Sequence, residues 1–117
     1  MALTLSGSNG ITGPNEASMV KAWVNFNQSS INDDGNVSSV TDNGTGDFTI
    51  NFSNSFSNVY YAISFGLDDN GYNDSAAYTG KAITWSTGST RVGTQYTNRF
   101  GDGRTDFNPS SCTFVGD

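Results

Sequence analysis

The chain has 117 residues, which suits a single domain, and five Lys and Arg against eleven Asp and Glu give a net charge of −6. This acidic balance argues against a partner rich in phosphate, including nucleic acid, because phosphates are bound by clustered cations. The chain contains no histidine, which excludes Ser-His-Asp or Cys-His catalysis and any histidine metal site.

The composition predicts an all-β protein. About half of the residues are Ser, Thr, Asn or Gly, while Leu and Glu, which commonly fill helices, are scarce. No apolar run is long enough to cross a membrane, and the N-terminus does not read as a secretion signal. Cys112 is the single cysteine, so no disulfide can form within the chain. We expect its side chain to act as a small buried hydrophobe.

The supply of large aliphatic and aromatic side chains is small for a chain of this length. A small core leaves a domain with little stability of its own, and burying surface against further copies compensates for this. The composition therefore favours a homo-oligomer.

The first 20 residues look like an extended N-terminal arm or anchor, which leaves residues 21–117 as the main domain. Leu3 and Leu5 alternate with polar residues, and glycines and a proline follow. Residues 15–23 fit either one helical turn capped by Asn15 or an extended lead-in to the next strand.

Alternation of apolar and polar residues predicts the first main strand, at residues 22–26. Residues 31–36, INDDGN, read as a turn. A hairpin is expected next, with strands at 37–41 and 48–52 joined by DNGTGD. Asn43 and Gly44 tolerate positive φ, and Gly46 permits a bulge. The side chains expected on one face of these strands are Ala22, Val24 and Phe26 in the first, with Trp23 and Asn25 opposite, and Phe48, Ile50 and Phe52 in the last.

Residues 59–67 repeat the pattern, and further strands are expected around 81–85, 90–96 and 111–115. In the 59–67 strand the side chains expected to face the core are Val59, Tyr61, Ile63, Phe65 and Leu67. Around seven strands with short turns predict a compact antiparallel β-sandwich or a barrel-like domain.

Close pairs of aspartates occur at 33 and 34, at 68 and 69, and at 102 and 106, and two carboxylates can hydrolyse a glycoside. Each pair lies among Gly and Asn in an expected turn, where aspartate bonds to the backbone, so we predict no catalytic residues. The segments 68–74 and 101–106 also gather oxygen ligands of the type that calcium prefers. Neither fits a calcium-binding loop pattern, and we predict no metal and no cofactor.

Two expected tip loops combine a tyrosine with amide or charged side chains. Flat rings can pack on the apolar face of a sugar while amides bond to its hydroxyls, and loops commonly carry binding residues. The candidate receptor-binding residues are Tyr72, Asn73, Asp74, Tyr96, Asn98 and Arg99.

Three segments together carry a resemblance to a known family. These are KAWVNFN at 21–27, the hairpin VSSVTDNGTGDFTINF at 37–52, and YYAISFG at 60–66. They resemble a domain of virion proteins from tailed bacteriophages, particularly phages of marine bacteria and cyanobacteria. The resemblance covers roughly the first two-thirds of the chain, including LTLSGSNGI at the N-terminus, and ends near Asp68.

The resemblance implies a non-enzymatic structural protein of the virion surface, a tail-fibre or spike module that forms a homotrimer and contacts the host. Other virion proteins and a host-surface glycan would be its partners, with no nucleic acid and no membrane insertion. One alternative places it on the capsid as a decoration or head-fibre protein. Another is a stand-alone carbohydrate-binding module without a viral role.

Overall fold

The computed structural model describes residues 4–6, 10–12, 19–68, 77–98 and 101–117, and every regular element within them is a β-strand. This confirms the all-β prediction. The strands are β1 (Thr4–Ser6), β2 (Gly10–Thr12), β3 (Val20–Asn27), β4 (Ser30–Gly35), β5 (Val37–Gly44), β6 (Asp47–Phe52), β7 (Ala62–Leu67), β8 (Ala77–Trp85), β9 (Ser89–Asn98), β10 (Gly101–Arg104) and β11 (Ser110–Val115).

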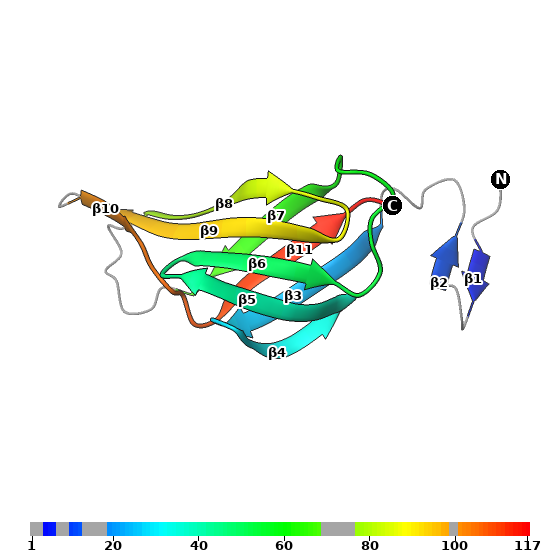
Figure 1. Ribbon diagram of the computed structural model, residues 1–117, viewed down its shortest axis with the longest axis horizontal. Coiled ribbons are helices and arrows are strands. Elements are labelled where there is room, and N and C mark those ends of the chain that lie inside the picture. Colours follow the sequence, from blue (N-terminus) through cyan, green and yellow to red (C-terminus); the bar gives the residue numbers. More distant parts are fainter. Residues whose placement is uncertain (1–3, 7–9, 13–18, 69–76, 99–100) are drawn as a thin grey trace.

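Strands β3 to β11 form two antiparallel sheets that face each other (Figure 1). The first sheet has the order β4-β3-β11-β7. The second has the order β10-β9-β6-β5, with β8 on the other edge of β9. The sandwich is therefore as predicted, although strand neighbours are often distant in sequence. β1 pairs with β2 in a separate small hairpin, with Leu5 opposite Ile11. The role of residues 1–20 as an arm stays a prediction, as does the trimer.

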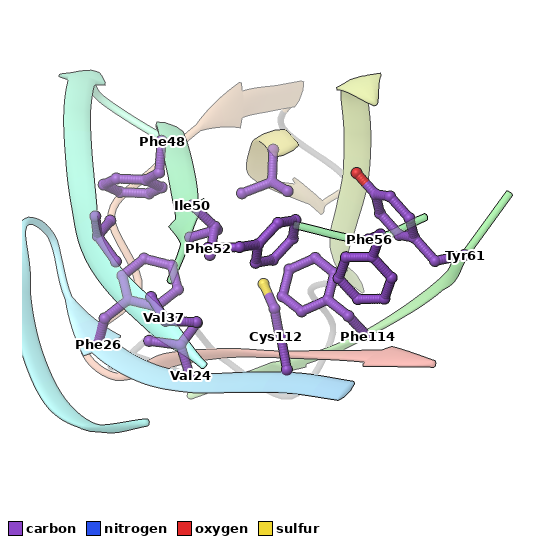
Figure 2. Close-up of a cluster of buried hydrophobic side chains, with 13 residues drawn as sticks. Val24, Phe26, Val37, Phe48, Ile50, Phe52, Phe56, Tyr61, Cys112 and Phe114 are labelled. Atoms are coloured by element: carbon purple, nitrogen blue, oxygen red, sulfur yellow. The ribbon is translucent and has the colours of Figure 1, made fainter. Parts of the chain in front are cut away.

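The core lies between the two sheets and is rich in aromatic rings (Figure 2). The ring of Phe26 in β3 meets that of Phe48 in β6 edge-on at 5.2 Å, and Phe52 in β6 meets Phe114 in β11 at 5.0 Å. These contacts join the two sheets directly, and edge-on pairs add stability beyond area burial. The inward direction predicted for residues 22–26 and 48–52 is confirmed, because period-two alternation places every second side chain on one face.

The β5–β6 hairpin is also confirmed. Gly44 has φ of 143° and Gly46 has φ of 63°, both in the range that favours glycine. A register shift occurs in this hairpin, but it lies between Asp42 and Gly44 rather than at Gly46, where a bulge was expected. These glycines allow the chain to reverse within two residues.

The turn predicted at residues 31–36 is wrong, because this segment is strand β4 at the edge of the first sheet. It pairs with β3 from Ser30 opposite Asn27 to Gly35 opposite Trp23. Polar residues suit an edge strand, because charges there discourage pairing with other chains. The same residue types, Asn, Asp and Gly, are also common in turns, which is why the sequence predicted a turn here.

Other strand boundaries also differ from the prediction. The strand expected at 59–67 begins at Ala62, so Val59 lies before it and is 40% exposed rather than inward. Tyr61 is buried, and the inward alternation from Ile63 to Leu67 holds. Of the two alternatives for residues 15–23, the extended one holds from Val20 onward, where β3 begins. Strands β8 and β9 are longer than expected, and β10 was not predicted.

Candidate functional site

Most of the predicted receptor-binding residues cannot be placed. Tyr72, Asn73, Asp74 and Arg99 lie outside the described residues, and Asn98 is the last residue of β9. Their role in binding stays a prediction.

Tyr96 is placed clearly, and its expected position in a tip loop is wrong. It lies within β9, opposite Tyr78 of β8 on one side and opposite Gly103 of β10 on the other. Its ring packs over Gly103, where an added Cβ would lie 3.4 Å from a ring carbon. The unpredicted strand β10 extends the sheet and leaves Tyr96 half-buried. Neighbouring strands therefore hold this ring in place.

A groove of about 490 Å³ lies where β7 of the first sheet runs beside β8 of the second. It is lined by Phe65, Leu67, Tyr78, Thr79 and Gly80. The lining supplies two aromatic rings, an aliphatic side chain and the hydroxyls of Tyr78 and Thr79, with no carboxylate, amine or thiol. Its aromatic and aliphatic walls could hold an apolar or aromatic group.

Close backbone packing shapes the walls of this groove. The ring of Phe65 occupies the space beside Gly80, where an added Cβ would lie 2.9 Å from Phe65 Cβ and closer still to the ring. Tyr78 packs edge-on against the buried ring of Phe107 at 5.3 Å. Alternation in 59–67 predicted Phe65 as inward, but no local pattern indicated that β8 would lie next to it.

Several of the described aspartates accept hydrogen bonds from backbone N–H groups, within strand β4 as well as in turns. Asp33 Oδ1 accepts from the N–H of Asp34 at 2.9 Å, and Asp34 Oδ1 accepts from the N–H of Val37 at 3.3 Å. Asp106 Oδ1 accepts from the N–H of Gly46 at 2.7 Å. Carboxylates used in this way shape loops and sheet edges.

An ion pair stands on the outer face of the second sheet. Arg91 Nε donates to Asp47 Oδ1 at 2.8 Å, and Arg91 Nη2 donates to Asp47 Oδ2 at 2.6 Å. These hydrogen bonds lower the pKa of the Asp47 carboxyl below its ordinary value, and the carboxylate raises the pKa of Arg91. The pair links β6 to β9, which points to a structural role.

No candidate metal site is found in the described part of the chain, because no three Asp, Glu or Cys side chains lie close together there. Of the predicted oxygen-rich segments, 69–74 lies outside the described residues, and in 101–106 the carboxylate of Asp106 is bonded to Gly46. No helix that could cross a membrane is found among the residues described.

The two ends of the sandwich differ in character (Figure 1). At one end the N–H of Gly116 donates to the carbonyl of Met19 at 3.2 Å, so both termini of the main domain emerge together. Four of the exposed large apolar residues belong to segments at this end, because β3 begins at Val20, Val59 and Tyr60 precede β7, and β8 ends at Trp85. β7 and β9 run away from it toward the opposite end. Those four side chains, here called the termini-end apolar residues, are Val20, Val59, Tyr60 and Trp85.

The exposure of these four residues was not predicted from the sequence, and Val59 was expected to face the core. Alternation places Tyr60 on the face opposite the buried Tyr61, and Tyr60 is indeed 89% exposed. Nothing local indicated that Val20 and Trp85 would lie at the same end as Tyr60. No protein-family model, curated protein or solved structure matches this chain.

Proposed function

We propose that this protein is a non-enzymatic surface module of a bacteriophage particle, held at the end where Met19 and Asp117 lie and presenting its opposite end outward. The single observation that carries the proposal is this difference between the two ends of the sandwich. The phage resemblance of segments 21–27, 37–52 and 60–66 supplies the viral setting.

The termini end suits attachment. Lys21 Nζ donates to the carbonyl oxygen of Asp117 at 2.7 Å, and Ser57 Oγ donates to the Asp117 carboxylate at 3.0 Å. These bonds tie the start of β3, the β6–β7 loop and the C-terminus into one surface. A partner that binds residues 1–18 would also contact this surface, because residue 18 directly precedes Met19.

The termini-end apolar residues support a protein partner at the same place. Tyr60 is 89% exposed, Val20 54% and Trp85 48%. An apolar interface at this end would bury them, and apolar and aromatic side chains commonly fill the centre of protein interfaces. Further copies of this chain, as in a trimer, or another virion protein would bury them.

The opposite end suits presentation. β7 ends there at Leu67 and β9 ends there at Asn98, so the chain segments that follow both strands start at that end. Five of the six predicted receptor-binding residues belong to these segments or border them. Binding residues on the connections of a rigid scaffold are a common arrangement.

Two measurements test the proposal. Antibody labelling of intact particles of the phage that encodes the chain should mark their exterior in electron micrographs. Label on tail tips supports a fibre or spike, label on heads supports the decoration alternative, and unlabelled particles contradict a surface role.

Light scattering on the purified chain tests the apolar interface. Three copies of the 12.4 kDa chain give 37.2 kDa, and we expect this mass for the native sequence. The double variant Val59→Ser, Tyr60→Ser should shift toward 12.4 kDa because it removes apolar area from the interface. Ser55→Ala, in the same exposed loop, is the control and should leave the mass unchanged. A native monomer at high concentration would contradict the trimer.

A further inference from the structure

The outer face of the first sheet carries one exposed tryptophan among small polar side chains. Cross-strand pairing aligns Gly35, Trp23, Thr113 and Ser64 in one row across β4, β3, β11 and β7. The next row on the same face aligns Asp33, Asn25, Ser111 and Gly66. We call the surface formed by Trp23, Asn25, Ser64, Ser111 and Thr113 the Trp23 face.

Trp23 is held in a fixed position. Its five-membered ring occupies the space above Gly35 of the neighbouring strand, where an added Cβ would collide with Nε1 and lie 2.8 Å from Cδ1. The side chain is nevertheless 39% exposed, so a substantial part of the indole remains available to a ligand. A ring that is already immobilised loses little conformational entropy when something stacks on it.

The polar groups beside the ring have unused hydrogen-bonding capacity. Within the described part of the chain, the hydroxyls of Ser64 and Thr113 make no hydrogen bond. Asn32 Nδ2 donates to Asn25 Oδ1 at 2.8 Å, which orients that amide and leaves its NH₂ group as a donor. Ser111 Oγ donates to the carbonyl of Gly66 at 3.3 Å and can still accept.

The dimensions suit a small elongated ligand. Two residues along a strand span roughly 7 Å, and three neighbouring strands span roughly 10 Å. Gly66 has no side chain, and Ser64 and Ser111 have short ones, so no large side chain blocks the surface beside Trp23. A flat ring could therefore lie against the indole and extend across β11 to β7.

We infer that the Trp23 face binds a neutral oligosaccharide. A pyranose ring has an apolar C–H face that stacks on an indole, and hydroxyls around its edge that pair with hydroxyls and amides. The two rows contain the carboxylate of Asp33 and no cation, which disfavours an anionic ligand. Trp23 is the one large apolar side chain in these rows, which disfavours a protein partner that needs an apolar interface core.

This inference goes beyond the proposed virion role and does not rest on it. The face lies on the side of the sandwich rather than at either end, and the isolated chain is sufficient for its test. The two tests are independent, because unlabelled particles would leave sugar binding intact and a failure of sugar binding would leave particle labelling intact.

The test uses the two tryptophans of the chain. Trp85→Phe leaves Trp23 as the sole indole, so its fluorescence reports on this face. Cellohexaose, maltohexaose, chitohexaose and, as the anionic probe, polygalacturonate are titrated into this variant. We expect at least one neutral oligosaccharide to change the emission of Trp23 with saturation, and polygalacturonate to leave it unchanged.

Matched variants then assign the site by calorimetry with the oligosaccharide that binds. Trp23→Ala should weaken binding about tenfold or more, and the double variant Ser64→Ala, Thr113→Val should weaken it severalfold while keeping the ring on Gly35. Thr49→Val, on the outer face of the other sheet, should bind as the native chain does. If Trp23→Ala does not fold, the affinity of the Ser64→Ala, Thr113→Val double variant shows whether the oligosaccharide binds at this face.

Three results would overturn the inference. They are no response to any of the neutral oligosaccharides, unchanged affinity in the folded variants, and burial of the face by a second copy. The last would appear as Trp23 emission that depends on protein concentration alone, with Trp23→Ala dissociating the oligomer.

Discussion

The backbone N–H of Gly46 donates to the carboxylate of Asp106 at 2.7 Å, across 60 residues of sequence. Gly46 also accepts from the N–H of Thr94 at 2.9 Å and from Arg104 Nη1 at 3.2 Å. The tip of the β5–β6 hairpin is thereby fixed to β9 and to the segment after β10. One glycine joins three parts of the second sheet.

Removing the acceptor should loosen this junction. Asp106→Ala is expected to lower the free energy of unfolding by about 1–3 kcal/mol, because a charge-assisted bond to a half-buried N–H is lost. Asp106→Asn keeps a carbonyl acceptor and should cost less. Urea unfolding followed by tryptophan fluorescence measures both, and equal midpoints for the two variants would show that the bond to Gly46 contributes little.

Gly46 and Gly44 offer a matched pair of substitutions. Both have positive φ, so alanine should cost about 1–3 kcal/mol of backbone strain at either position. At Gly46 an added Cβ would also collide with the carbonyl of Thr94 and lie 2.8 Å from the N of Thr105, whereas nothing lies within 4 Å at Gly44. Gly46→Ala should therefore be clearly the less stable variant in thermal unfolding. Equal melting temperatures would contradict the close packing at Gly46.

Acid should remove the stabilisation that comes from the Asp47–Arg91 pair. The pKa of Asp47 is lowered in the folded state, so its contribution is present above the pKa of the unfolded chain and is lost as pH falls through the folded value. Arg91 is 46% exposed, so the effect should be small and weaker in high salt. Native protein and Asp47→Asn should differ in urea midpoint at pH 7 and converge near pH 2. A difference that persists at pH 2 would contradict the ionic origin.

Cys112 should be unreactive while the protein is folded. The structure confirms that it is buried, and burial raises the pKa of its thiol to about 12. Because the thiolate is the reactive form, a disulfide reagent at pH 8 should label no thiol in native protein and one per chain in guanidinium. Rapid labelling of native protein would mean that this part of the core opens readily.

Tyr61→Phe should destabilise the sandwich although it retains the ring. The Tyr61 hydroxyl donates to the carbonyl of Ser86 at 2.7 Å and bonds to the buried hydroxyl of Thr90. Losing it leaves Thr90 without this partner in the core, at a cost of about 1–2 kcal/mol. The double variant Tyr61→Phe, Thr90→Val removes both hydroxyls and should recover part of the loss. A double variant less stable than Tyr61→Phe would show that the Thr90 hydroxyl has another essential role.

Side-chain direction within a strand could be predicted from the sequence. In β3, β6 and β7 the alternation assigned Phe26, Ile50 and Phe65 to the inner face, and the structure agrees. The β5–β6 turn followed from its glycines in the same way. Both features depend on neighbouring residues alone, because the pleat repeats every two residues and the left-handed conformation is a property of single residues.

Strand pairing could not be predicted in this way. β11 lies between β3 and β7, and β9 pairs with β6, although these partners are far apart in sequence. The edge position of β4, the placement of Tyr96 inside the sheet and the packing of Trp23 on Gly35 all follow from those pairings. The sequence by itself therefore determined most of the strands and most of the side chains that face inward, because these depend on local geometry. The tertiary structure alone decided which surfaces meet and which stay exposed, because backbone hydrogen bonds between strands can form equally well with many partners, and the choice depends on how the whole core packs.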